Sequence, residues 1–200
     1  MAESARARKQ LERFRAQQAG RGVWESHWDD LARVMLPRRL GFTSAVAPGE
    51  KRTNDLYDGT PMQAAVGLAN AIGGMLRPDG EKIAYIKAAD DADERIGEAK
   101  DWLAEKEEQL DDVLKDPKAR LRQATGECDL DLVVFGTGCI FEGEGRGLDH
   151  LMFQSVHLKD AYPMFDAEGA PAGLRRRRKL TVAQAVEEFG LGNVSEEVRR

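Results

Sequence analysis

Residues 121–147, LRQATGECDLDLVVFGTGCIFEGEGRG, hold a helical pattern that changes to a strand pattern at one glycine turn. The segment Gly136–Gly138 suits a turn, because glycine reaches positive φ without steric cost. Cys139–Phe141 then favours a strand that returns along another element. The side chains at helical spacing, which predict one buried helix face, are Leu121, Thr125, Cys128, Leu132 and Phe135.

The same helical spacing places the charged side chains of this stretch largely on other faces. Asp129 and Asp131 could pair as a general acid and base, but neighbouring positions of a helix point in different directions. We therefore expect both aspartates, with Arg122 and Glu127, to lie on a solvated helix face.

Helical patterns precede this stretch and strand patterns follow it, so the fold class expected is α+β, with several helices packed on a small, mostly antiparallel sheet. We expect residues 1–52 to form a helical arm and loop, and residues 53–200 to form an α+β body continuous with that arm. The arm holds a stripe of Trp24, Trp28, Leu31 and Met35 before Pro37, which is more typical of core packing than of ligand stacking.

Capping and turn signals place the other elements. Thr60-Pro61 predicts a helix N-terminus, and glycines 67, 73 and 74 within that helix predict a bend or a close helix crossing. Asp116-Pro117 ends a long acidic helix, and Thr181–Gln184 is a capping box. The strands predicted are Ile83–Ile86, Leu151–Val156 and the pair Tyr162–Phe165 with Leu174–Leu180. Ser195 caps a further helix that the sequence cuts short, so the chain looks truncated.

Composition narrows the class of protein. The chain has 200 residues, of which 42% are hydrophobic and 32% charged, as in ordinary globular proteins. It holds no apolar run long enough to span a bilayer and no signal peptide, so we expect it inside a cell and not in a membrane. Cys128 and Cys139 match no zinc or disulfide spacing, so reduced thiols are expected.

Charge is distributed unevenly along this chain of net charge -5. Acidic residues gather between Asp90 and Asp116, and five consecutive cations run through Arg175, Arg176, Arg177, Arg178 and Lys179. The cations alternate between the faces of a predicted strand, so they cannot all be buried. A solvated or intersubunit edge is favoured over contact with nucleic acid.

No catalytic, cofactor-binding or metal-binding residues are predicted. The glycine-rich segment Gly143–Gly147 lacks the lysine and hydroxyl residues of a phosphate loop and is typical of a hairpin tip. The histidines 27, 150 and 157 lack metal-ligand spacing. Two other functions stay open: a small nucleic-acid-binding module built on Arg175–Lys179, and a nucleotide-hydrolysing enzyme acting through Asp129, Asp131 or the glycine segment.

A series of short motifs carries a resemblance over nearly the whole chain. The first motifs are Trp24-Glu25 with Trp28 leading to Leu36–Arg39, the loop Gly49–Arg52, Leu56–Thr60, and Leu68-Ala69 through Leu76–Pro78. The later ones are Trp102-Leu103, Phe135–Gly138, the arginine strand followed by Leu180–Gln184, and Phe189-Gly190. In this order and spacing they resemble the N-terminal part of the head-to-tail connector, or portal, proteins of short-tailed bacteriophages.

The resemblance implies a structural subunit without a reaction of its own and without a cofactor. It implies a homo-oligomeric ring, usually a dodecamer when full length, at one vertex of the capsid. The partners implied are the major capsid and scaffolding proteins, the terminase, tail adaptor proteins and the double-stranded DNA that passes through the channel. The protein would reside in the virion, and in the host cytoplasm during assembly.

Length separates this chain from the family pattern. Portal subunits of this type continue into a stem and a clip, so the 200 residues would correspond to the outer wing-like region. Subunit contacts around a ring join two different patches, and the acidic helix and the basic hairpin are complementary candidates.

Overall fold

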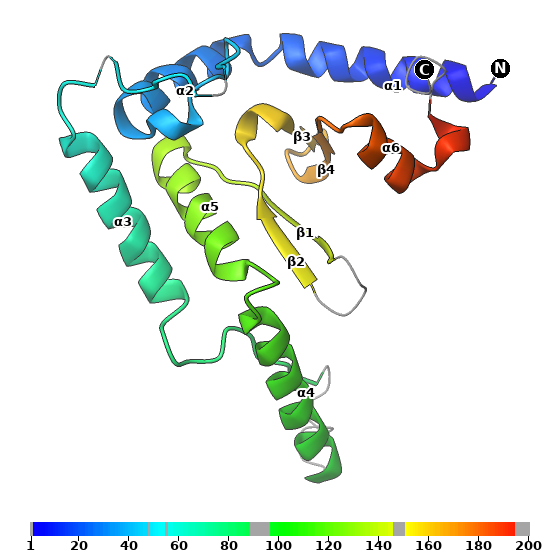
Figure 1. The fold of residues 1–200 in the computed structure, drawn as a ribbon. Coiled ribbons are helices and arrows are strands. Elements are labelled where there is room, and N and C mark those ends of the chain that lie inside the picture. The colour runs from blue at the N-terminus through cyan, green and yellow to red at the C-terminus, as the bar shows by residue number, and fades with distance from the viewer. Residues whose placement is uncertain (1, 48, 55, 89–96, 146–150, 195–200) are drawn as a thin grey trace. The chain divides into compact units, whose positions relative to one another are not determined.

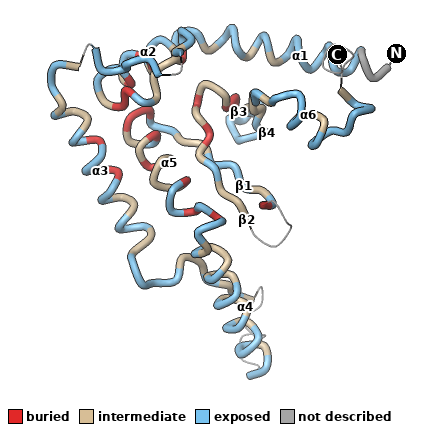
Figure 2. The backbone as a smooth tube through the Cα atoms, in the orientation of Figure 1, coloured by how far each residue is buried: buried red, intermediate tan, exposed pale blue. Residues whose placement is uncertain are grey.

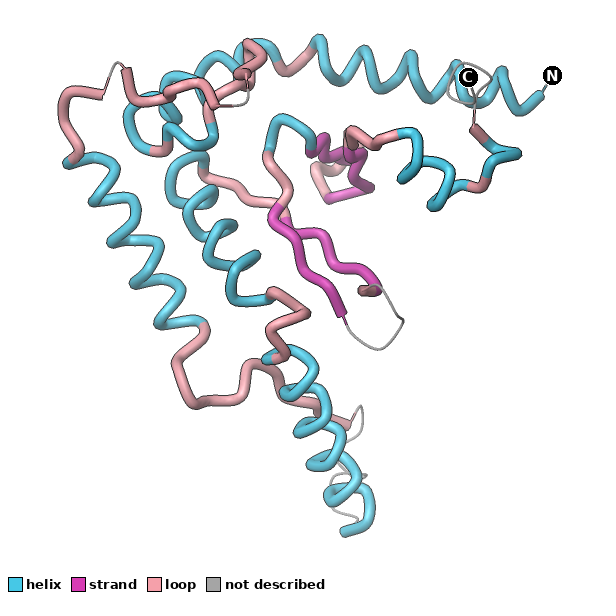
Figure 3. The backbone as a smooth tube through the Cα atoms, viewed as in Figure 1, coloured by secondary structure: helices cyan, strands magenta, loops and turns pink. Residues whose placement is uncertain are grey.

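The computed structural model describes residues 2–47, 49–54, 56–88, 97–145 and 151–194. The chain separates into two compact units, Met1–Lys159 and Asp160–Arg200. Among the described residues lie six α-helices and two hairpins of two antiparallel strands each (Figures 1 and 3). The α+β class is therefore confirmed, although the strands form two small sheets and not one. A division at residue 52 stays a prediction.

The first unit contains five helices and the first hairpin. Its elements are α1 (Ala2–Ala19), α2 (Gly22–Met35), the 3-10 turn η1 (Pro37–Arg39), α3 (Thr60–Leu76), α4 (Gly97–Lys115), α5 (Leu121–Phe135), β1 (Ile140–Glu144), β2 (Leu151–Ser155) and the 3-10 turn η3 (Leu158–Asp160), whose last residue is the first of the second unit. Helix α5 packs against both α3 and strand β2 (Figure 1). It is the central element of this unit.

The turn after α5 forms as predicted. Gly136 ends the helix at φ 74°, and its N–H is bonded to the carbonyl of Leu132. Strand β1 then pairs with β2 in a register that places Ile140 opposite Ser155 and Glu144 opposite Leu151. Of the expected glycine tip, Gly143 and Glu144 belong to β1, whereas Arg146 and Gly147 lie outside the described part of the chain.

The buried face of α5 differs from the prediction. Leu121 and Phe135 are buried as expected, but Leu132 is 45% exposed. Asp129 and Asp131 are buried, at 7% and 1% exposure, so their placement on a solvated face was wrong. The helix therefore turns two carboxylates toward the protein interior, where they meet arginines from distant segments.

The core of the first unit forms where α2, η1 and α5 meet (Figure 2). The buried ring of Phe42 stands 5.4 Å from the rings of both Trp28 and Phe135, measured between ring centroids. Trp24 is 60% exposed, so only Trp28 of the two indoles packs on the core as expected. The fully buried Ala32 allows this close packing on the α2 side.

Helix α3 crosses α5 closely at one glycine. A Cβ at Gly73 would lie 3.2 Å from Asp129 Oδ2, whereas Gly67 and Gly74 have open space around them. The close crossing expected from the glycines is thus confirmed at Gly73 alone. The N-cap position of α3 is Gly59, and Thr60 is the first residue of the helix. The hydroxyl of Thr60 donates to Asp58 Oδ1 at 2.7 Å.

The segment Ile83–Ile86 is not a strand. The backbone N–H of Ile83 donates to Asp111 Oδ1 at 3.1 Å, and that of Ile86 donates to Glu107 Oε1 at 3.0 Å. Two carboxylates on α4 thus take the place of a neighbouring strand. Helix α4 ends at Lys115, as the following Asp116-Pro117 predicts.

The second unit contains the basic hairpin. Its described elements are β3 (Ala161–Phe165), β4 (Pro171–Arg176), α6 (Val182–Phe189) and the 3-10 turn η4 (Leu191–Asn193). The hairpin and the capping box of Thr181 with Gln184 form as predicted. Strand β4 ends at Arg176, earlier than expected, and the cap predicted at Ser195 lies outside the described residues.

Candidate functional site: the basic segment and the arginine–carboxylate contacts

The predicted basic site, Arg175–Lys179, begins on β4 and continues beyond it. Arg177 Nε lies 2.9 Å from Asp160 Oδ1, and its backbone N–H donates to the carbonyl of the same residue at 2.8 Å. Arg178 makes a bidentate contact with Glu188, at 2.7 and 2.8 Å. Two of the five cations are therefore paired with carboxylates of their own unit.

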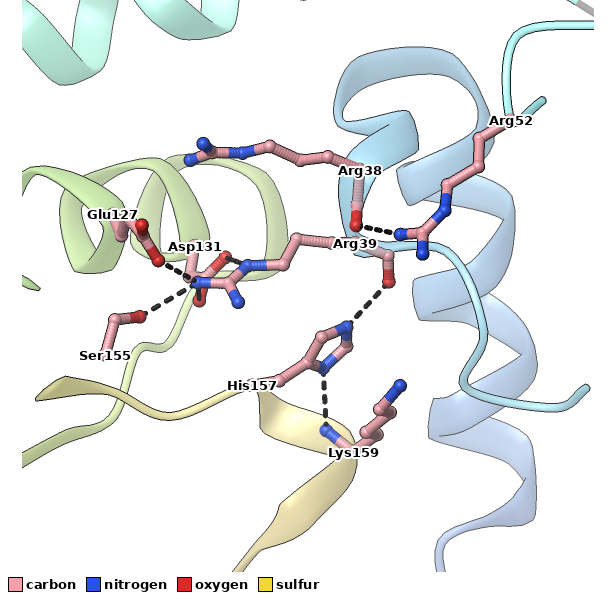
Figure 4. A network of polar contacts seen from close by, with 8 residues as sticks. All are labelled: Arg38, Arg39, Arg52, Glu127, Asp131, Ser155, His157 and Lys159. Atoms are coloured by element: carbon pink, nitrogen blue, oxygen red, sulfur yellow. Dashed lines mark hydrogen bonds and ion pairs between the residues drawn. The ribbon is translucent and has the colours of Figure 1, made fainter. Parts of the chain in front are cut away.

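The first unit is organised around Arg39, which appears in the sequence only as the end of the motif Leu36–Arg39. Its Nε donates to Asp131 Oδ1 at 2.9 Å, and its Nη2 donates to Ser155 Oγ at 2.8 Å and to Glu127 Oε2 at 3.3 Å (Figure 4). One guanidinium thus links η1, α5 and β2. No local pattern could identify these partners, because Asp131 is 92 positions away.

Asp131 retains one oxygen without a hydrogen bond. Arg39 Nη2 lies 2.9 Å from Oδ2, but the two hydrogens of that nitrogen are used by Ser155 and Glu127, and Oδ2 has no donor. Burial raises the pKa of Asp131 from 3.8 to about 6, and the opposing attraction of Arg39 does not compensate. The carboxylate is held in place at an electrostatic cost.

The backbone of Arg39 is fixed by a histidine. His157 Nε2 lies 2.9 Å from the carbonyl of Arg39, and the N–H of Lys159 donates to His157 Nδ1 at 3.1 Å (Figure 4). The imidazole also packs against the ring of Phe42, with centroids 4.8 Å apart. His157 therefore has a structural role, with hydrogen bonds at both ring nitrogens.

Asp129 has a different arginine from its neighbour on α5. It forms an ion pair with Arg77, which follows α3, and the pair lines a hollow of about 250 Å³ with Arg122 and Asp79. Arg122 and Asp79 are themselves ion-paired. The two aspartates of α5 therefore have separate partners and do not form the acid–base pair that the enzyme hypothesis needs.

Asp29 is a third buried carboxylate with a structural role. Its Oδ1 accepts hydrogen bonds from the N–H groups of Gly41 and Phe42 at 3.1 and 3.0 Å, and its Oδ2 accepts from the N–H of Thr43 at 3.0 Å. Burial acts to raise the pKa of Asp29, but the bonds from Thr43, Phe42 and Gly41 outweigh it and leave the pKa below its ordinary value. Asp29 thus fixes the loop that carries Phe42 into the core.

Cys128 is not a reactive thiol, and the described part of the chain holds no metal centre. Burial raises the pKa of Cys128, with Asp131 and Asp129 adding to the effect, so the thiol stays protonated. Across the described ranges, no group of three or more histidine, cysteine, aspartate or glutamate side chains could hold a metal ion. No helix among those residues is both long and apolar enough to cross a membrane.

Comparison with known proteins identifies the family of this chain. A family model described as bacteriophage head to tail connecting protein matches residues 7–200. The chain belongs to this family. The predicted resemblance to head-to-tail connector and portal proteins is confirmed, and the family is a structural, non-enzymatic one, as expected.

Two curated relatives of this head-to-tail connecting protein match along its whole length. The portal protein of Salmonella phage epsilon15 is 29% identical over 208 residues, which cover 100% of this chain and 35% of the relative. The probable portal protein of Bordetella phage BPP-1 is 27% identical over 202 residues, covering 100% of this chain and 36% of the relative. The chain thus spans about a third of the length of these two relatives.

Proposed function

We propose that this chain forms the outer, wing-like part of a portal subunit in a homo-oligomeric ring, a dodecamer when full length, at one vertex of a phage capsid. The observation that carries the proposal is the family match over residues 7–200, together with alignment of the whole chain to two portal relatives. In this role the protein takes part in capsid assembly, genome packaging, DNA passage and tail attachment. Its partners are the capsid and scaffolding proteins, the terminase, tail adaptors and double-stranded DNA.

The charges of the chain fit a ring that conducts DNA without holding it. Each phosphate neutralised by a cation adds salt-dependent affinity, so a cationic surface would slow a moving duplex. The net charge is -5, and Arg177 and Arg178 are paired with carboxylates of their own unit. These features favour a ring that lets DNA pass. They argue against a nucleic-acid-binding role for Arg175–Lys179.

The basic segment belongs in this proposal as a contact between neighbouring subunits. A ring is built from heterologous contacts, in which one patch meets a different patch on the next copy. The cations at the end of β4 can form one side of such a contact if the neighbouring copy presents an anionic surface to them. The segment Arg175–Lys179 is thus assigned to the side of the subunit and not to the channel.

Negative-stain electron microscopy of the full product of the gene tests this function. Rings with a central channel are expected, and antibody against residues 1–200 is expected to label phage particles at one vertex. A product that forms no ring, or labelling spread evenly over the capsid, would refute the proposal. Duplex binding by the 200-residue chain that falls steeply with salt would favour a nucleic-acid-binding module instead.

A further inference from the structure

Helix α4 carries a row of carboxylates along one exposed face. Asp101, Glu105, Glu108 and Asp112 recur at steps of four, three and four residues, so they share a face of the helix, and all four are exposed. Among the described residues, the side chains of Asp101, Glu108 and Asp112 have no partner, and those of Glu105 belong to the same helix. Like charges four positions apart destabilise a helix, so this face favours a cationic partner.

Helix α1 carries the opposite charge. It holds five cations and two glutamates, and it makes no extensive contact with another described helix or strand. Arg6, Lys9 and Arg13 recur at steps of three and four residues, so they share one face, and all three are exposed. None of the three has a partner among the described residues, whereas Phe14 and Gln17, on a different face, do.

We propose that the face of α1 formed by Arg6, Lys9 and Arg13 docks on the carboxylate face of α4 in a neighbouring copy. The occupant of the acidic face is thus a second copy of this chain. The inference rests on the proposed ring and names one of its contacts. Because the two faces differ, the contact is heterologous and leaves each copy with one face for the next copy, as a ring requires.

The spacing of the charges supports this pairing as well as their sign. In an antiparallel pair of helices, the steps of three and four residues from Arg6 to Arg13 match the steps from Glu108 back to Asp101. Each face extends over about 10 Å, from the rise per residue of a helix. The resulting pairs are Arg6 with Glu108, Lys9 with Glu105, and Arg13 with Asp101. Antiparallel helices also bring the positive N-terminal end of each beside the negative C-terminal end of the other.

The basic hairpin is a less suitable partner for α4. Arg177 and Arg178 are paired with carboxylates of their own unit, and Arg175 and Arg176 also make contacts within the chain. Pairing of α1 with α4 of the same copy is not observed as an extensive contact, although both helices belong to the first unit. The cations of α1 in a second copy are therefore the better match.

Charge reversal on two faces of α1 tests the proposal in the 200-residue chain. Sedimentation equilibrium measures association, and far-UV circular dichroism checks that every variant folds. The variants are K9E/R13E, D101K/E105K, the combination of these four changes, and the control R8E/R15E. The control changes the net charge as much as K9E/R13E does, on a face about 130° away around the helix.

The wild type is expected to associate, and added salt is expected to weaken this association because exposed ion pairs are screened. K9E/R13E and D101K/E105K are each expected to weaken it about tenfold or more, since two ion pairs become repulsive. The combination is expected to restore association to within about threefold, because opposite charges face each other again. The control is expected to match the wild type.

Disulfide trapping tests the register. A mixture of R13C and D101C joins two copies, and mass spectrometry identifies the heterodimer. The matched control is a mixture of R13C and D112C, because Asp112 lies on the same face of α4 but about 16 Å further along it. The first mixture is expected to give heterodimer about tenfold faster. The unsubstituted chain accounts for the native Cys128 and Cys139.

Four results would overturn the inference: a wild-type chain that stays monomeric, double variants that associate as the control does, a combination that restores nothing, or equal trapping in the two mixtures. Duplex DNA binding that K9E/R13E and R8E/R15E weaken equally, without association between copies, would assign α1 to nucleic acid instead. Failure of the proposed function gives a different result, because the full product then forms no ring in electron microscopy. Rings of the full product that tolerate K9E/R13E would reject the α1 contact and leave the portal function in place.

Discussion

Arg39 Nε donates a hydrogen bond of 2.9 Å to Asp131 Oδ1, joining residues 92 positions apart. The Asp131 side chain is only 1% exposed and that of Arg39 only 12%, so the pair is shielded from water. Because Arg39 also contacts Glu127 and Ser155, this one side chain connects the turn after α2 to the central helix and to the first hairpin. The stability of the first unit should therefore depend strongly on it.

Replacing Arg39 by methionine is expected to destabilise the first unit by about 3 kcal/mol, because Asp131 would be left buried without its counter-charge. Urea unfolding followed by tryptophan fluorescence measures this, since Trp24, Trp28 and Trp102 all belong to that unit.

The double variant R39M/D131L provides the control for this experiment. It removes both charges and replaces them with apolar groups, so it should recover much of the loss. A double variant that is less stable than R39M alone would contradict the ion-pair explanation.

The raised pKa of Asp131 predicts a pH dependence with a defined sign. Since the pKa is about 6 in the folded state and about 3.9 in an unfolded chain, the folded state binds more protons between these values. The free energy of unfolding is therefore expected to rise as pH falls from about 7 to about 4, by up to about 3 kcal/mol.

The Asp131→Asn variant isolates this effect, because its side chain does not titrate. The difference in unfolding free energy between wild type and variant should change with pH over this range and level off above it. A difference that stays constant from about pH 4 to about pH 7 would contradict the assignment. Asp29 does not interfere, because its lowered pKa places its own loss of stability below about pH 4.

Removing the carboxylate of Asp29 is expected to release the loop that follows η1. Asp29→Ala leaves the N–H groups of Gly41, Phe42 and Thr43 without their acceptor, at a cost of about 2 to 3 kcal/mol. Hydrogen exchange should show faster exchange at these three amides. Thr43→Ala, which removes only the hydroxyl contact, should have a smaller effect and leave the amides protected.

Gly138 is expected to tolerate no side chain. An added Cβ would lie 2.4 Å from Cys128 Sγ and 3.0 Å from the carbonyl oxygen of Cys128. Gly138→Ala should therefore destabilise the first unit by about 1 to 3 kcal/mol in urea unfolding.

Gly126, in the interior of α5, is the matched control, because a Cβ there meets nothing within 4 Å. Gly126→Ala should stabilise the chain by about 0.5 to 1 kcal/mol, since alanine favours helix. Equal effects of the two alanines would show that the contact with Cys128 is unimportant.

Local signals in the sequence predicted many elements and their ends. Gly136 at the end of α5, the capping box of Thr181 with Gln184 and the stop at Asp116-Pro117 each act through neighbours a few positions away. Such signals need no knowledge of the rest of the fold. Ile83–Ile86 failed as a strand because its hydrogen-bond acceptors are carboxylates on α4 and not a second strand.

The candidate site was predicted only in part, because the partners of its charged side chains are distant in the sequence. The run Arg175–Lys179 is visible in the sequence, but its internal pairing depends on Asp160 and Glu188, which the hairpin and the capped helix bring near. The structural contacts of Arg39 carried no local signal, because a basic residue beside a loop is usually solvated.

The sequence alone determined the α+β class, the turn from α5 into β1 and the resemblance to phage head-to-tail connecting proteins, because these depend on short-range spacing and on motif order. Only the tertiary structure decided which face of α5 is buried. Apolar periodicity placed Asp129 and Asp131 in solvent, whereas Arg77 and Arg39 arrive from 52 and 92 positions away and supply the charges that make their burial possible.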